Sequence, residues 1–274
     1  MRPLLGCFVE IGVRSAAGGE AAQAAVAAGF AALQRAQALW SFHDPDSELS
    51  RLNRGGSDWT ALSSATLRLL RAARAMQLAS GGAFDCTLGG TLVRDGNLPD
   101  HGGPEPLERG EPQDIELAPA RARLRRPLRL TLDGIAKGYA VDLATRAMRR
   151  HGAHAGWVNA GGDARAFGPL ALAMQRRELD GRCVPLGDLR NAALASSAVP
   201  GPSPRQQLCA ATFPGRILAP QGNAAPGLWT VLARSAWRAD ALTKVAACAL
   251  APQRAALVAR LGGHLVEPGA GSRT

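Results

Sequence analysis

The sequence predicts an α+β fold with mixed sheets and packed helices. The chain has 274 residues, of which 46% are hydrophobic, so it can bury a core as one large domain or as two closely packed ones. Strand-like and helix-like segments alternate, but without the regular spacing that successive βαβ units produce. We therefore expect one unit of two intimate lobes over residues 1–268, followed by a disordered tail at residues 269–274.

Hydrophobic periodicity predicts a strand and then a long helix at the N-terminus. Residues 8–11 alternate as in a strand, and residues 20–40 repeat apolar side chains at helical spacing. The Asp-Pro-Asp-Ser sequence that follows is typical of a turn, and Ser47 is placed to cap a short helix. A further helix is expected over residues 63–79, and the Ser80-Gly-Gly sequence that follows ends it.

The remaining elements are predicted by the same rules. Residues 95–114 hold Gly, Pro, Asp and Glu with little apolar content, which indicates an exposed loop. A strand followed by a turn is expected at residues 83–90. Further strands are expected within 121–131, at 157–160, as a pair over 170–183, and at 228–236. Helices are expected at 138–151, 239–250 and 252–262.

The clearest functional signal is the segment Leu130-Thr-Leu-Asp-Gly-Ile-Ala-Lys-Gly-Tyr-Ala-Val-Asp142. It is followed, after one helix, by Trp157-Val-Asn-Ala-Gly-Gly-Asp163. Strand ends that carry glycines bring backbone N–H and C=O groups close to a ligand. Lys137 adds a positive charge where the helix begins. Together with Gly161 and Gly162, this pattern predicts a site for a small molecule that bears phosphate.

The charge pattern does not indicate a nucleic-acid partner. The formal net charge is +10, which alone would suit nucleic acid, a membrane surface or an anionic ligand. The arginines are scattered, however, and no interleaving of Arg with aromatic residues is present. An Arg-for-Lys habit of a GC-rich genome is the simpler explanation for the many arginines.

Cysteine usage and the N-terminus predict a cytoplasmic protein. The five cysteines are widely spaced and form no Cys-x-x-Cys pair, so neither a disulfide framework nor a zinc site is expected. The pattern of the first residues predicts a strand rather than an export signal. The sequence contains no apolar run of about 18 residues, so no integral membrane segment is expected. The periplasm is the alternative location if an export signal was removed.

Five segments, taken in order, resemble the ApbE-type FAD:protein FMN transferases. The most specific is Asp133-Gly-Ile-Ala-Lys-Gly-Tyr-Ala-Val-Asp142 with Asn159-Ala-Gly-Gly-Asp163. The others are Gly6-Cys-Phe-Val-Glu10, the segment from Ser41 to Asn53, Phe84-Asp-Cys-Thr-Leu-Gly89, and Ala239-Asp-Ala-Leu-Thr243.

The resemblance implies a two-lobed α+β fold that holds FAD between the lobes. It also implies an enzyme that uses Mg²⁺ to break the FAD pyrophosphate, passes FMN to a Thr or Ser of an acceptor flavoprotein, and releases AMP. A divalent cation offsets charge on the pyrophosphate oxygens and prefers few protein oxygen ligands.

The resemblance also assigns site residues in this chain. Asp240 falls at the position of the family's metal-binding carboxylate. The flavin contacts fall on Leu5, Thr131, Asp133, Lys137, Gly161, Gly162 and Leu218, and the metal ligands on Gly134, Asp240 and Thr243.

The chain departs from the family pattern at two of the expected catalytic positions. Lys244 stands where the family has a metal-binding Thr or Ser, and Thr243 is one residue early, about 100° round the helix. Arg216 stands where the family has a His base, and a guanidinium cannot accept a proton. We therefore expect Asp240, Lys244 and Arg216 at the catalytic centre, with Lys244 and Arg216 supplementing the metal and the base electrostatically. The alternative is a flavin-binding or flavin-delivery protein that does not transfer FMN.

Overall fold

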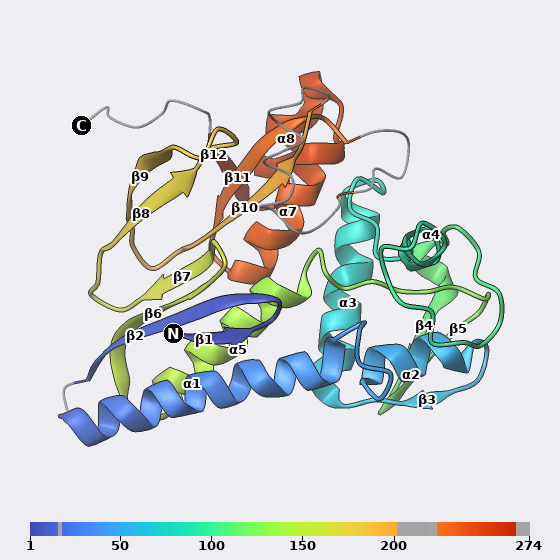
Figure 1. Cartoon of the computed structure of the whole chain (residues 1–274), viewed down its shortest axis with the longest axis horizontal. Coiled ribbons are helices and arrows are strands. Elements are labelled where there is room, and N and C mark those ends of the chain that lie inside the picture. Colours follow the sequence, from blue (N-terminus) through green and yellow to red (C-terminus); the bar gives the residue numbers. More distant parts are fainter. Residues whose placement is uncertain (16–17, 202–216, 218–223, 267–274) are drawn as a thin grey trace. The chain divides into compact units, whose positions relative to one another are not determined.

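The computed structural model describes residues 1–15, 18–201, 217 and 224–266 (Figure 1). These residues form two compact units, one drawn from residues 1–33 and 137–274 and the other from residues 34–136. The predicted tail at 269–274 lies outside the described residues. That residues 1–268 act as one functional unit stays a prediction. Within the described residues, no helix is both long and apolar enough to cross a membrane.

The first unit is built on a seven-stranded sheet with the order β1-β2-β6-β7-β10-β11-β12. A separate hairpin is formed by β8 and β9. The strands are β1 (Arg2–Leu4), β2 (Cys7–Ser15), β6 (Ala153–Ala160), β7 (Asp163–Phe167), β8 (Leu172–Arg177), β9 (Cys183–Leu189), β10 (Ala193–Val199), β11 (Gly227–Ala233) and β12 (Gly263–Val266).

Helices pack against this sheet and bury its core. The helices are α1 (Gly19–Trp40), which continues into the second unit, α5 (Ala136–Arg150), α7 (Ala236–Cys248), a short 3-10 turn (Ala251–Gln253) and α8 (Arg254–Arg260). α7 lies along β10 and β11 (Figure 1). A Cβ added at Gly29 of α1 would lie 2.9 Å from Ile11 of β2 and 3.1 Å from Met148 of α5, so this glycine allows close packing of the three elements.

The second unit combines short helices with a three-stranded sheet. Its elements are α2 (Glu48–Gly55), β3 (Thr60–Ala61), α3 (Ser64–Ala79), α4 (Gly89–Arg94), a 3-10 turn (Pro112–Asp114), β4 (Ile115–Ala118) and β5 (Arg121–Leu124). The predicted cap at Ser47 is confirmed, because Ser47 accepts a hydrogen bond from the backbone N–H of Ser50. Ser63 caps α3 in the same way and accepts from the N–H of Thr66. The carboxylate of Glu48 also accepts from the N–H of Ser63 at 2.9 Å and so joins α2 to α3.

The α+β class is confirmed, but two expectations about strands are wrong. The sheets do not combine parallel and antiparallel strands, since each of their strand pairs within the described residues is antiparallel. Tight turns join several chain neighbours, and such turns impose antiparallel pairing. Residues 83–90 are not a strand. Leu88 forms one isolated bridge, and α4 begins at Gly89, where a Cβ would lie 2.4 Å from the backbone oxygen of Arg129.

In the second unit, the side chain of Asn53 holds the segment that leads to the Gly-Lys motif. Its Nδ2 donates to the Leu130 oxygen at 2.9 Å, and its Oδ1 accepts from the Leu130 N–H at 2.8 Å. The N–H of Thr131 donates to the oxygen of Cys86 at 2.9 Å. Two of the segments that resemble the ApbE family therefore meet at the residues that lead directly into a third.

Replacement of Asn53 by Ala is predicted to destabilise the protein. Asn53 is buried, so the change leaves two backbone groups of Leu130 without partners and lowers the free energy of unfolding by about 2–4 kcal/mol. Urea denaturation measures the change. Asn97→Ala is the matched control, because the Asn97 side chain is exposed and makes one long hydrogen bond of 3.4 Å. Equal stability of the two variants would contradict the prediction.

Candidate functional site

Two tight hairpin turns in the first unit form one side of the site. Leu5 and Gly6 join β1 to β2 with φ of 56° and 70°, and Gly161 and Gly162 join β6 to β7 with φ of 61° and 101°. Two-residue turns with positive φ at both positions match the twist of the flanking strands. The turns are neighbours, because a Cβ added at Gly161 would lie 2.8 Å from the Cβ of Cys7.

Lys137, in the first turn of α5, pairs with Asp163, the first residue of β7. The Nζ of Lys137 lies 3.2 Å from the Oδ2 of Asp163. Among the described residues, no donor meets hydrogen-bond geometry to this buried oxygen, so the contact is an ion pair. The side chain of Lys137 is 31% exposed, whereas that of Asp163 is buried. The Lys137 side chain is therefore partly accessible to a ligand.

The charges of this pair are set by opposing effects. The Asp163 carboxylate raises the pKa of Lys137 above its ordinary value, although burial acts in the other direction. Burial raises the pKa of Asp163, while the ammonium groups of Lys137 and Lys244 lower it and the Asp240 carboxylate adds to the rise. Lys137 is therefore an ammonium at neutral pH, and the four side chains belong to one electrostatic cluster.

Asp240 of α7 is fully buried and joins three elements. Its Oδ2 accepts from the N–H of Gly138 in α5 at 3.0 Å, and its Oδ1 accepts from the Nζ of Lys244 at 2.5 Å. The Nζ of Lys244 also donates to the Oγ of Ser197 in β10 at 3.2 Å. Gly138 allows this approach, because a Cβ there would lie 2.3 Å from the oxygen of Ala236.

Thr243 points its hydroxyl at protein atoms. Its Oγ1 donates to the backbone oxygen of Asp240 at 2.7 Å, and the Oγ of Ser197 lies 2.7 Å from the Oγ1 of Thr243. The residue is fully buried. A threonine hydroxyl bonded to a carbonyl earlier in its own helix is satisfied without any ligand.

The first unit thus brings together most of the predicted site residues. The cluster consists of Lys137, Asp163, Asp240 and Lys244, and Ser197 and Thr243 complete its hydrogen bonds. Leu5, Gly161 and Gly162 lie in the two turns. Thr131, Asp133 and Gly134 belong to the second unit, in the segment before α5. Arg216 and Leu218 lie outside the described residues, so their predicted roles stay predictions.

Sequence reasoning undervalued two of these residues. Asp163 received no site role from the sequence, but the Gly-Gly turn aims it at Lys137. Ser197 received none either, and it accepts a hydrogen bond from Lys244. A further signal was present in the sequence, because the chain contains two lysines and both lie in this cluster.

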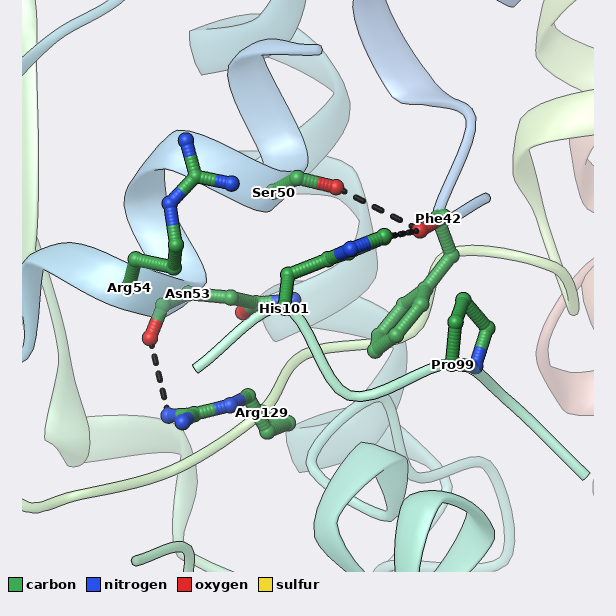
Figure 2. Close-up of a pocket in the computed structure, with 7 residues that line it drawn as sticks. All are labelled: Phe42, Ser50, Asn53, Arg54, Pro99, His101 and Arg129. Atoms are coloured by element: carbon green, nitrogen blue, oxygen red, sulfur yellow. Dashed lines mark hydrogen bonds between the residues drawn. The ribbon is translucent and has the colours of Figure 1, made fainter. Parts of the chain in front are cut away.

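A pocket in the second unit is a structural feature rather than a candidate site. Figure 2 shows its lining, in which Arg129 and His101 face Phe42 and Asn53. Arg129 donates to the backbone oxygens of Asn53, Gly102 and Pro104 at 2.8–2.9 Å, and Nε2 of His101 lies 2.8 Å from the oxygen of Phe42. These polar groups tie loops together and are already engaged.

A comparison with protein families identifies the chain. The model described as the ApbE family matches residues 5–265. The chain belongs to the ApbE family. No curated protein sequence matches this family member at a significant level.

Solved ApbE structures share its fold. The apo flavinyl transferase ApbE of Pseudomonas stutzeri has a TM-score of 0.72 at 20% identity, covering 95% of this chain and 94% of its own. The ApbE protein of Thermotoga maritima has a TM-score of 0.75 at 22% identity, with coverage of 96% and 91%. The flavin transferase ApbE of Vibrio cholerae has a TM-score of 0.68 at 23% identity, with coverage of 89% and 84%.

The residues around Asp240 do not fit the magnesium ion that the family resemblance implies. Mg²⁺ binds oxygen atoms whose lone pairs face it in near-octahedral geometry. Both Asp240 oxygens and the Thr243 hydroxyl are engaged by protein donors, and an ammonium touches the carboxylate. Within the described residues, no group of three or more His, Cys, Asp or Glu side chains could hold a metal.

Asp142 fixes the start of α7 and so places Asp240. This fully buried residue of α5 pairs with Arg165 of β7. Its carboxylate accepts from the backbone N–H groups of Ala236 and Trp237 at 3.0 and 3.1 Å. It therefore satisfies N–H groups that the first turn of a helix leaves unpaired. The role of Asp142 is therefore structural, as a cap at the start of α7.

Replacement of Asp142 by Ala is predicted to lower the free energy of unfolding by about 3–5 kcal/mol, because it leaves a partly buried arginine and two helix N–H groups without their partner. Thermal and urea unfolding measure the loss. Asp188→Ala is the control, since the Asp188–Arg190 pair is exposed and such pairs contribute about 1 kcal/mol or less. A loss for Asp142→Ala no larger than that of the control would refute the assignment.

Proposed function

We propose that this ApbE family member transfers FMN from FAD to a Thr or Ser hydroxyl of an acceptor flavoprotein, with release of AMP. The observation that carries the proposal is the position of the Lys137 ammonium beside the Gly161–Gly162 turn. A compact positive charge next to a turn of two glycines, which lack side chains and let a ligand come close to the backbone, suits a phosphate ligand. Family membership and the relatives called flavin transferases support flavin as the rest of that ligand.

The distribution of charge supports an anionic ligand in the first unit. That unit contains nineteen Lys and Arg residues against nine Asp and Glu residues, whereas the second unit contains thirteen of each. The whole net charge of +10 therefore falls on the unit that contains the lysine cluster. A positive field of this kind raises the local concentration of a phosphate ligand such as FAD.

The reaction exchanges one phosphorus–oxygen bond for another. The acceptor hydroxyl oxygen forms a bond to the phosphorus of the FMN half, and the bond from this phosphorus to the bridging oxygen breaks. AMP leaves with the bridging oxygen, and the hydroxyl proton passes to a base or to water. Lys137 and Lys244 would stabilise the negative charge that spreads over the phosphate oxygens.

One feature favours a second candidate function, flavin binding without transfer. Phosphoryl transfer to a hydroxyl benefits from a group that accepts the proton. The position that resembles the family's base is Arg216, whose guanidinium stays protonated. A protein that retains the ammonium cluster but lacks the base would hold FAD and release it unchanged.

The two candidates are separated by one assay. The purified protein is mixed with FAD, with and without MgCl₂, and with flavoproteins from the same cell. AMP is measured by chromatography, and acceptor flavinylation by in-gel fluorescence. Transfer predicts equal amounts of AMP and flavinylated acceptor. Saturable FAD binding with neither product supports the second candidate, and the absence of any FAD binding contradicts both.

Removal of the Lys137 ammonium is predicted to weaken the flavin interaction. Lys137→Met should raise the dissociation constant for FAD, or lower kcat/KM if transfer occurs, by about 10- to 100-fold through loss of a charge-assisted hydrogen bond. Isothermal titration measures the change. Arg182→Met removes an exposed cation that pairs with Asp180, and it should leave the affinity unchanged. An unaltered affinity in Lys137→Met would refute the role of Lys137.

A further inference from the structure

Both lysines of the chain lie in the cluster around Asp163 and Asp240. The sequence has 32 Lys and Arg residues together, and Lys137 and Lys244 are its two lysines. A lysine ammonium is a compact charge with three donors, whereas a guanidinium is a broad planar fork. Because this chain uses arginine at every other cationic position, the two lysines indicate a place where a compact charge is needed.

Lys244 occupies the space next to the carboxylate that the resemblance assigns to the metal. Its Nζ lies 2.5 Å from the Oδ1 of Asp240, while the Oδ2 of Asp240 accepts from the Gly138 N–H at 3.0 Å. A divalent cation at this carboxylate would meet an ammonium within contact distance, and two positive charges this close repel each other strongly. The ammonium therefore competes with a metal for the same oxygen.

The neighbouring hydroxyl groups reinforce this arrangement. Ser197 accepts from Lys244 at 3.2 Å and lies 2.7 Å from the Oγ1 of Thr243, which donates to the backbone of Asp240 at 2.7 Å. These bonds form a continuous chain from the ammonium to α7. The groups are partners of Lys244 and of one another, so a metal ion would have to break the chain to gain ligands.

We propose that the Lys244 ammonium takes the place of a divalent cation in this protein, so that the site binds phosphate groups without Mg²⁺. The identity of the ligand as a flavin dinucleotide rests on the proposed function. Among the described residues, Asp240 and Ser197 take two of the three ammonium hydrogens. The third remains for a phosphate oxygen, and the side chain is 20% exposed.

The first test measures metal binding without any flavin. Electron paramagnetic resonance of free Mn²⁺ should show no binding to the wild-type protein tighter than about 1 mM. Lys244→Thr removes the competing charge and places a hydroxyl one helical turn after Asp240, so its Mn²⁺ affinity should exceed that of the wild type by more than about tenfold. Arg190→Thr removes an exposed cation paired with Asp188 and should bind no more Mn²⁺ than the wild type.

The second test measures the dissociation constant of FAD in MgCl₂ and in EDTA. For the wild-type protein the two values should agree, whereas for Lys244→Thr the value in EDTA should be weaker by more than about tenfold, since that variant would need the metal to supply the missing charge. If Lys244→Thr does not fold, Lys244→Ser and the wild-type measurements replace it.

Two results would overturn the proposal. One is Mn²⁺ binding by the wild-type protein together with EDTA-sensitive FAD binding. The other is failure of the folded Lys244→Thr and Lys244→Ser variants to gain Mn²⁺ affinity, which would show that the ammonium does not exclude the metal. Absence of FAD binding in the wild type would refute the proposed function, but the metal titration would still decide the role of Lys244.

Discussion

The buried carboxylate of Asp240 is the constraint on which the first unit depends. A fully buried charge is tolerated when it is paired and hydrogen-bonded, and Asp240 satisfies both conditions through Lys244 and the N–H of Gly138. These bonds fix the start of α5 against α7, and Ser197 extends them to β10. The same bonds hold the Lys244 ammonium in the electrostatic cluster that contains Lys137 and Asp163. Stability and ligand binding therefore rely on one set of contacts.

The first unit also requires backbone segments to pack closely against one another, and glycines make this possible at several points. Gly138 lets α5 approach α7, and the two-residue turn at Gly161 and Gly162 adopts positive φ values, with the Gly162 N–H donating to the Oδ1 of Asn159 at 3.0 Å. In the second unit, Asn53 binds both backbone groups of Leu130 and so orders the segment that runs into the same motif. A motif that looks local in the sequence is thus held from both of its ends by long-range contacts.

The sequence predicted the helices well because their signals are local. Apolar spacing and serine caps located α1, α2 and α3, and glycine marked the end of α3. The strand expected at residues 83–90 is not formed, because Gly89 and Gly90 lie against the backbone of distant chain segments. No local sequence pattern reveals such contacts. The resemblance pointed to Lys137 and Asp240, but not to Ser197 as a partner of Lys244. That contact depends on how β10 lies against α7, which is a property of tertiary packing.

The most direct test of the account is a crystal structure of the protein with FAD and MnCl₂, in which manganese is located by its anomalous scattering. The account predicts phosphate oxygens within hydrogen-bond distance of Lys137 and Lys244. It also predicts that the Lys244–Asp240 pair stays intact and that no manganese peak lies beside Asp240. A manganese ion bound to Asp240 with Lys244 displaced, or FAD phosphates bound away from both lysines, would contradict it.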